Sequence, residues 1–137
     1  MNECKIFSKE EINKILGQEP VSGKHQLEPL KSLFSSKQIP FGIIEDMKVE
    51  GGESEAHLCD GDLWLVLEGE PVFEYGGELI DKWVREGSNG NELGGKGIRG
   101  GKKTKLKAGD WFWIPPGQPH VHYADFARMV IIKIHTA

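Results

Sequence analysis

The stretch Gly109–His122 reads GDWFWIPPGQPHVH and decides the fold. Its Trp-Phe-Trp-Ile run is rich in the aromatic and branched residues that favour a β-strand. Pro115-Pro116-Gly117 then predicts a rigid turn. A second strand is expected from His120 onward, in which His120 and His122 share a face because strand residues two apart point the same way. The stretch therefore predicts two strands joined at a proline corner, with two imidazoles on one surface.

A second stretch, Glu55–Gly69, reads EAHLCDGDLWLVLEG and contains a hairpin signal. Asp60-Gly61 is a turn dipeptide between two strand-like runs. Glu55 and His57 lie two residues apart and therefore share a strand face, and Asp62 opens the returning strand. We expect this hairpin to bring His57 and Asp62 to one point.

The composition agrees with a small all-β domain. The chain has 137 residues, enough for one domain with its own core. Its 18 glycines and seven prolines predict many tight turns. Short strand-like segments between these turns favour a sandwich or barrel. The segments are Gln26–Leu30, Phe41–Val49, Glu55–Leu58, Leu63–Leu67, Val72–Tyr75, Leu79–Val84, Lys103–Leu106, Trp111–Ile114, His120–Tyr123 and Met129–His135.

One helix is expected before these strands. Ser8 and Glu11 have the spacing of a capping box, and the apolar residues that follow recur at helical intervals. The pattern predicts a short helix over residues 9–16. We divide the chain into an N-terminal helical extension, residues 1–25, that packs on a barrel domain, residues 26–137.

Charge and composition exclude several classes of function. Lys and Arg number 17 against 21 Asp and Glu, a net charge of −4. This balance argues against a nucleic-acid binder, because such proteins need a basic surface. No run approaches the about 18 apolar residues of a membrane span, and the start, MNECKIFSKEE, has no apolar signal region. With only two cysteines, the chain is expected to be cytoplasmic and to have no membrane partner.

Together the two quoted stretches resemble the two sequence motifs of the cupin superfamily. In the second motif, Gly109, Pro115-Pro116-Gly117 and His120 have the usual spacing, whereas Ala124 stands where the family usually has Asn. In the first motif, Asp62–Gly69 matches well. The resemblance covers roughly residues 40 to 135 and extends to a subgroup of small bacterial cupins.

The head of the first motif departs from the usual pattern. The family usually has His-x-His followed by Glu, whereas here Glu55 takes the first His position, His57 the second and Asp62 the Glu position. The resemblance implies an antiparallel jelly-roll β-barrel, frequently a homodimer, with one divalent metal ion inside it. The ligands it implies are His57, Asp62 and His120, with Glu55 as a fourth candidate.

The types of donor support the same set of residues. Two imidazoles and one carboxylate on one face, with open positions, form the facial triad of non-haem Fe(II) oxygenases. Imidazole also suits Zn, Ni and Cu, while further carboxylate oxygen shifts the preference towards Mn or Fe. The sequence therefore does not distinguish Fe, Mn, Ni and Zn.

Residues near the motifs have more than one interpretation. His122 could line the pocket, carry a proton or lie on the surface, and we take it as the nearest proton carrier for catalysis. Trp64 is expected to face the interior as a wall of a substrate pocket. Cys59 is expected to be a partly buried spectator at the hairpin tip, and His25 and His135 to be structural.

Three other features of the sequence lie outside the candidate metal ligands. Trp111 and Trp113 are expected on the face opposite to their strand neighbours, and an outer face with two tryptophans would suit a homodimer interface. Arg85–Gly101, which reads REGSNGNELGGKGIRGG, is predicted to be an irregular loop that is either functional or mobile. The lysines of residues 102–107 indicate a solvated edge strand, or alternatively a mouth for anionic substrates.

These observations favour a metal-dependent enzyme that acts on a small organic molecule. Oxygenase, isomerase and lyase chemistry all stay open, since a fold does not determine a reaction. The alternative is a non-catalytic cupin that binds or senses a small molecule. A third hypothesis is a storage-type or structural cupin that has lost its metal.

Overall fold

The computed structural model describes residues 3–136. Within this range, two short helices and twelve strands follow one another along the chain. The elements are α1 (Lys9–Leu16), β1 (Gly23–Gln26), α2 (Leu30–Ser35), β2 (Phe41–Val49), β3 (Ser54–His57), β4 (Asp60–Gly69), β5 (Val72–Tyr75), β6 (Glu78–Ile80), β7 (Trp83–Val84), β8 (Glu92–Gly95), β9 (Gly97–Arg99), β10 (Lys102–Lys105), β11 (Trp111–Ile114) and β12 (His120–His135).

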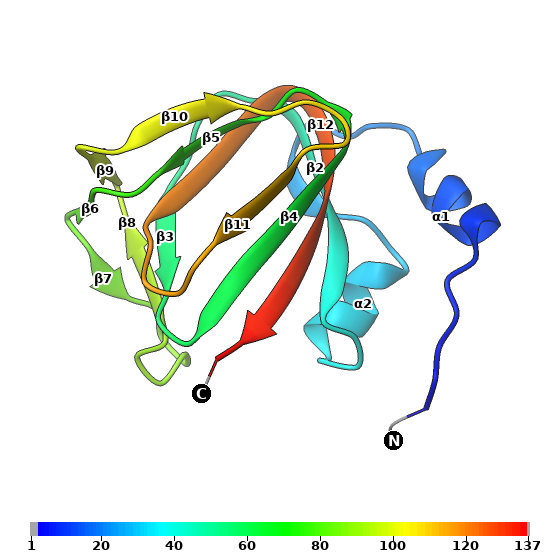
Figure 1. Cartoon of the computed structure of the whole chain (residues 1–137), viewed down its shortest axis with the longest axis horizontal. Coiled ribbons are helices and arrows are strands. Elements are labelled where there is room, and N and C mark those ends of the chain that lie inside the picture. The colour runs from blue at the N-terminus through cyan, green and yellow to red at the C-terminus, as the bar shows by residue number, and fades with distance from the viewer. Residues whose placement is uncertain (1–2, 137) are drawn as a thin grey trace.

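Two antiparallel sheets share the long strand β12 (Figure 1). One sheet has the order β1, β2, β12, β4, β11. The other has the order β7, β8, β3, β12, β5, β10, and a separate ribbon joins β6 and β9. Within residues 3–136 the strand ladder does not close into a full ring. The predicted all-β fold of the antiparallel jelly-roll type is confirmed.

The strand β12 changes partners along its length, and this change positions the site. Its first residues, 120–123, pair with β5, whereas residues 127–135 pair with β4. Figure 1 shows the strand bending from one layer of the molecule into the other. Side chains at the two ends of β12 can therefore reach the same interior from different sheets.

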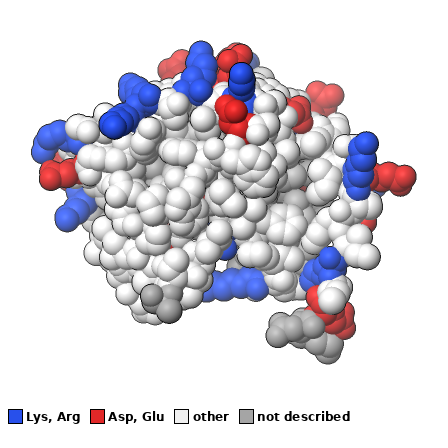
Figure 2. All heavy atoms as spheres, viewed as in Figure 1, with Lys and Arg blue, Asp and Glu red and all other residues white. Residues whose placement is uncertain are grey.

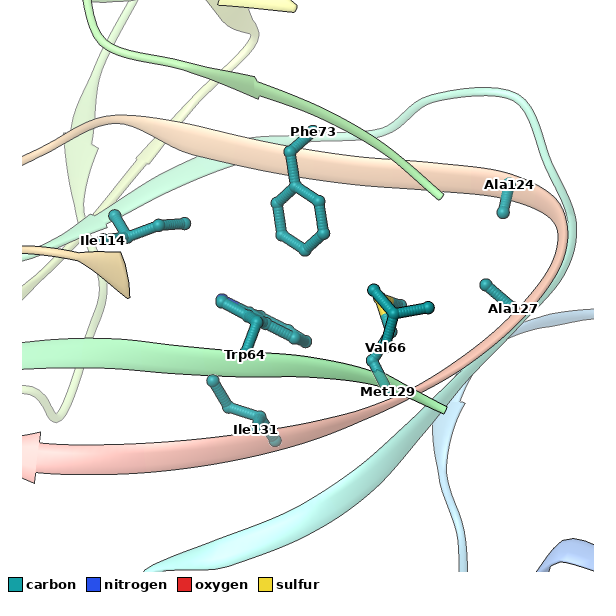
Figure 3. Close-up of a cluster of buried hydrophobic side chains, with 8 residues drawn as sticks. All are labelled: Trp64, Val66, Phe73, Ile114, Ala124, Ala127, Met129 and Ile131. Atoms are coloured by element: carbon teal, nitrogen blue, oxygen red, sulfur yellow. The ribbon is translucent and has the colours of Figure 1, made fainter. Parts of the chain in front are cut away.

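The interior between the two layers contains a compact apolar core (Figure 3). Trp64 and Val66 enter it from β4, Phe73 from β5, and Met129 and Ile131 from β12. Each of these five side chains is at most 2% exposed. Trp64 and Val66, like Met129 and Ile131, are two residues apart and therefore lie on the same face of their strand. One face of β4 and one face of β12 thus pack in this core.

A buried ion pair attaches the N-terminal segment to the sheet. Arg128 Nε donates to Glu45 Oε1 at 2.8 Å, and Arg128 Nη2 donates to the Gln18 carbonyl at 2.5 Å. Arg128 also donates to the Leu16 carbonyl at the end of α1. The buried charges of Arg128 and Glu45 are thus paired and hydrogen-bonded, the condition under which proteins tolerate them.

The predicted helix over residues 9–16 is confirmed as α1, and Ser8 accepts from the Glu11 amide at 3.1 Å. The predicted strand Gln26–Leu30 is wrong, because β1 ends at Gln26 and the short helix α2 begins at Leu30. Leu30 is fully buried in a second apolar cluster, together with Leu27, Ile39 and Ile43, so tertiary packing decides the local structure. Neither helix of the described range is long and apolar enough to cross a membrane.

Three other strand assignments need correction. Leu79–Val84 divides into β6 and β7, with Asp81 between them in the left-handed region at φ 47°. His120–Tyr123 and Met129–His135 are parts of one strand, β12. The Arg85–Gly101 segment contains β8 and β9 and is not wholly irregular.

The outer face of β11 presents its two tryptophans. Trp111 is 59% exposed and Trp113 is 42% exposed, whereas Ile114 points inward and is buried. The opposite parity expected for the two tryptophans is thus observed. Figure 2 shows few charged side chains over the middle of the face that contains β4 and β11, and most of the charges visible in this view lie towards its rim.

Candidate metal centre

Four side chains from β3, β4 and β12 meet inside the molecule. His120 of β12 lies opposite Glu55 of β3 in the sheet register, and directly opposed residues share a face. His57 follows Glu55 by two residues on β3 and points to the same side. Asp62 comes from β4 in the other sheet, directly after the hairpin turn. The structure therefore brings together all four residues expected to bind a metal.

The donor atoms alternate between nitrogen and oxygen. His57 Nε2 lies 3.5 Å from Glu55 Oε1 and 3.4 Å from Asp62 Oδ2. His120 Nε2 lies 3.5 Å and 3.3 Å from the same two oxygens. One donor atom from each of Glu55, His57 and His120 lies within 4.8 Å of the other two, a spacing at which three side chains could hold one metal ion. Asp62 Oδ2 is close to both imidazole nitrogens and is a fourth candidate donor beside this group of three.

The second nitrogen of each imidazole is already engaged. His120 Nδ1 donates to the Gln118 carbonyl at 2.9 Å, and His57 Nδ1 donates to the Glu92 carboxylate. In the neutral rings, Nε2 therefore holds a lone pair directed at the carboxylates. His120 Nε2 is buried and has no hydrogen-bond partner within residues 3–136. Since a lone pair facing carboxylate oxygens needs a proton or a cation between them, these donors fit a divalent ion.

Two residues of the Gly-rich segment support the centre, and the sequence analysis did not find them. Glu92 of β8 lies opposite His57 in the register, which explains its contact with Nδ1. Arg85 Nη2 lies 3.3 Å from Glu55 Oε2. Carboxylates that accept from a ligating histidine fix its tautomer and orientation. The segment holds five charged residues, and nothing in the sequence sets these two apart from the other three.

Lys133 is a third residue that the sequence analysis missed. It lies opposite Asp62 in the register of β12 and β4, and its Nζ donates to Asp62 Oδ1 at 2.7 Å. The same Nζ is 3.0 Å from His57 Nε2. An ion bound at Nε2 would have to displace this ammonium group from the imidazole.

The four groups shift one another's protonation. Burial opposes the charged form of His57, but the hydrogen bonds that the charged ring donates to Asp62 and Glu55 outweigh it and raise its pKa to about 10. The same two carboxylates raise the pKa of His120 against the effect of burial. In return, despite burial, the imidazoles hold the pKa values of Glu55 and Asp62 well below their usual range. Protons thus occupy the ion-free centre at neutral pH.

The centre opens into a cavity of about 800 Å³. Trp64 and His122 line this cavity, as the four candidate ligands do. His122 Nδ1 donates to Asp46 Oδ2 at 2.6 Å, and its ring lies 4.9 Å from that of Trp64. Burial lowers the pKa of His122 although Asp46 acts in the opposite direction, so the ring is neutral near pH 7.

The other residues considered from the sequence lie elsewhere in the described structure. Cys59 is exposed, so the expectation that it is partly buried is wrong. It lies at the solvent-facing hairpin tip. His25 Nε2 lies 3.0 Å from Glu45 Oε2, and His135 Nδ1 lies 2.8 Å from Asp60 Oδ1. In the described range, none of these three residues lines the cavity of the centre.

The chain was compared with known proteins. No protein-family model matches the sequence, and no curated protein matches it either. Solved structures with a similar fold include the cupin domain of CENP-C from Drosophila melanogaster, at 15% identity and a TM-score of 0.48, over 69% of this chain and 60% of that one. The same domain was also solved bound to CAL1.

Two other similar structures are described as enzymes or metal complexes. They include FeII HppE, at 13% identity and a TM-score of 0.49, over 69% of this chain and 43% of that one. Hydroxypropylphosphonic acid epoxidase from S. wedmorenis matches at 14% identity and a TM-score of 0.49, over 69% and 42%. The chain thus spans 42% to 65% of the length of these structures. One of these neighbours is a cupin domain, but at 13–15% identity and TM-scores below 0.5 no property of these proteins is carried over to this chain.

Proposed function

We propose that this protein binds one divalent metal ion through His57, His120, Glu55 and Asp62 and acts on a small organic molecule as a metal-dependent enzyme. The observation that carries the proposal is the pair of imidazoles whose Nε2 atoms both lie 3.3–3.5 Å from the same two carboxylate oxygens. This donor set of two nitrogens and two oxygens suits Mn, Fe and Zn.

The chain's own residues would prepare both the centre and the substrate. Glu92 and the Gln118 carbonyl orient the two imidazoles, and Trp64 forms an apolar wall beside them. His122, neutral and held by Asp46, is the nearest group that could accept or deliver a proton within the cavity. A bound ion would supply Lewis acidity or redox chemistry at a position left open by the protein.

Elemental analysis tests the metal part of this proposal. Protein purified without added metal, and then incubated with Mn, Fe or Zn and desalted, is expected to retain about one ion per chain. The double variant His57→Ala/His120→Ala should lose that ion. His25→Ala/His135→Ala, which removes two histidines outside the cavity, is the matched control and should retain it. Wild-type protein that binds no ion under these conditions would contradict the proposal.

Turnover tests the enzymatic part. Oxygen uptake and product formation with enolates, sugar acids and small aromatic compounds would identify an enzyme. His122→Gln, which preserves a hydrogen-bonding side chain, should bind the ion but lose most of the activity if His122 carries a proton. An unchanged rate for this variant would remove His122 from the reaction.

One observation favours the non-catalytic alternative, a metal-free binding or sensor module. The ammonium group of Lys133 already contacts Asp62 and His57 and could take the place of an ion. In that case Lys133→Met would destabilise the protein without any change in metal content. If the protein were a metal-binding enzyme, the same variant should bind the ion at least as tightly as the wild type, because a competing cation is removed.

A further inference from the structure

The end of the cavity formed by β1 carries polar groups that the metal centre does not use. Lys24 and Gln26 lie two residues apart on β1 and both line the cavity, together with Trp64 of β4. In the register of β1 and β2, Lys24 lies opposite Asp46, the partner of His122. These groups therefore form one polar region beside the candidate ion site.

Several polar atoms in this region lack partners. Trp64 is 2% exposed, and neither its indole Nε1 nor Gln26 Oε1 has a hydrogen-bond partner in the described part of the chain. Lys24 is an exposed residue of β1 whose Nζ donates to the His122 carbonyl at 2.7 Å, and the two other donors of its ammonium group are left for solvent or for a bound molecule. The Trp64 and Gln26 atoms are buried, and buried polar atoms normally have a partner. A bound molecule that accepts from Lys24 and Trp64 and donates to Gln26 would satisfy them.

The charges indicate the sign of that molecule. Asp46, Glu55 and Asp62 contribute three negative charges around the cavity, and Lys24 and Lys133 contribute two positive charges. With a divalent ion bound between neutral imidazoles, these groups sum to +1. Arg85 and Glu92 cancel each other, and the remaining charges at the mouth are exposed to solvent, where they are screened. A monoanion would therefore neutralise the loaded cavity.

We infer that this region binds the carboxylate of a small organic acid, with the Lys24 ammonium and the Trp64 indole N–H as donors and Gln26 as acceptor for a hydroxyl group. The inference rests on the proposed function in that the ion supplies the excess positive charge and a second anchoring point. The matching substrate is a hydroxy acid small enough for a cavity of about 800 Å³. Burial lowers the pKa of Lys24 while Asp46 raises it, and a bound carboxylate would favour its charged form.

Calorimetric titration of the full chain loaded with Mn2+ tests this inference. The probes are glycolate, lactate and malate, each compared with its neutral amide. At least one acid is expected to bind about tenfold or more tightly than its amide. Lys24→Met should weaken binding of that acid about 10- to 100-fold, the usual effect of losing a hydrogen bond to a charged group. Trp64→Phe, which keeps an aromatic ring but removes the N–H, should weaken it about three- to tenfold.

Controls separate this inference from the metal proposal. Lys48→Met removes an exposed lysine at the cavity mouth and should leave acid binding unchanged. Titration with Mn2+ alone should give the same affinity for Lys24→Met as for the wild type, which also shows that the variant is folded. If Mn2+ binds but no acid is preferred over its amide, or Lys24→Met and Trp64→Phe bind the acid as the wild type does, the inference is wrong and the metal centre stands. If Mn2+ does not bind while ion-free protein still prefers the acid in a Lys24-dependent way, the metal proposal fails and the acid-binding region stands.

Discussion

Replacing Glu92 removes the carboxylate that holds His57 in position. The Glu92 side chain is 26% exposed and contacts His57 Nδ1, which turns Nε2 towards the proposed ion. Loss of such an orienting partner typically weakens metal binding about 10- to 100-fold, which corresponds to about 1.4–2.7 kcal/mol of binding free energy. We expect an effect of this size for Glu92→Ala. Glu92→Gln should have a smaller effect because its amide oxygen still accepts from Nδ1.

The assay is a competition titration of Mn2+ or Zn2+ against a chelator of known affinity. Glu86→Ala is the matched control, since Glu86 is an exposed acid on the same segment and carries the same charge. Melting temperatures of the ion-free proteins show whether the variants are folded. If Glu92→Ala and Glu86→Ala weaken binding equally, the effect is one of net charge. The proposed orientation of His57 by Glu92 would then be wrong.

Further predictions concern stability, pH and association. Arg128→Met removes the guanidinium group paired with buried Glu45 and leaves that carboxylate only its contacts with His25 and the Val21 amide. It should lower the free energy of unfolding in urea by about 3–5 kcal/mol; a loss below about 1 kcal/mol would contradict the importance of this ion pair. Gly69 has φ 79°, and an added Cβ would lie 2.0 Å from a main-chain oxygen of β12, so Gly69→Ala should destabilise the fold by about 2–4 kcal/mol. Because the pKa of His57 is raised to about 10, the stability from its ion pairs in the ion-free protein should be complete below about pH 6.5 and lost as the pH rises through about 10. Metal affinity should rise over the same range by about tenfold per pH unit for each proton displaced, and a pH-independent affinity in chelator competition would argue against ligation by the protonated imidazoles. If Trp111 and Trp113 form a homodimer interface, sedimentation should show a dimer for the wild type and a monomer for the variant with lysine at both positions, and a monomeric wild type would exclude the dimer.

The strands that could be predicted from the sequence are those in which the residues' own preference and the tertiary packing favour the same structure. In β11, alternating Trp, Phe and Ile residues followed by two prolines leave no competing structure, and the predicted bounds are those observed. The positions of His57, Asp62 and His120 followed from the hairpin and the proline corner, because strand parity determines which side chains meet. Their convergence is thus a consequence of short-range sequence patterns.

The errors arise where distant parts of the chain decide the outcome. Helix α2 begins at Leu30 because this side chain packs in an apolar cluster with residues far from it in sequence. The local sequence pattern does not show such contacts. Glu92 and Lys133 reach the centre only through the register of β8 with β3 and of β12 with β4. Register depends on the pairing of strands tens of residues apart, so no motif surrounds either residue. Their roles could be found only from coordinates.

The sharing of β12 between the two layers has a consequence for folding. The cavity joins Lys24 of β1 to Lys133 near the end of β12, and the ladder of β12 with β2 and β4 must form before the cavity exists. During synthesis, neither the candidate ion site nor its acid-binding neighbour can assemble until about residue 133 has left the ribosome. Folds with such sequence-distant pairings form slowly and expose unpaired strands meanwhile. An ion added during refolding should therefore bind late, after the folding transition state. It should lower the rate of unfolding and leave the rate of folding unchanged.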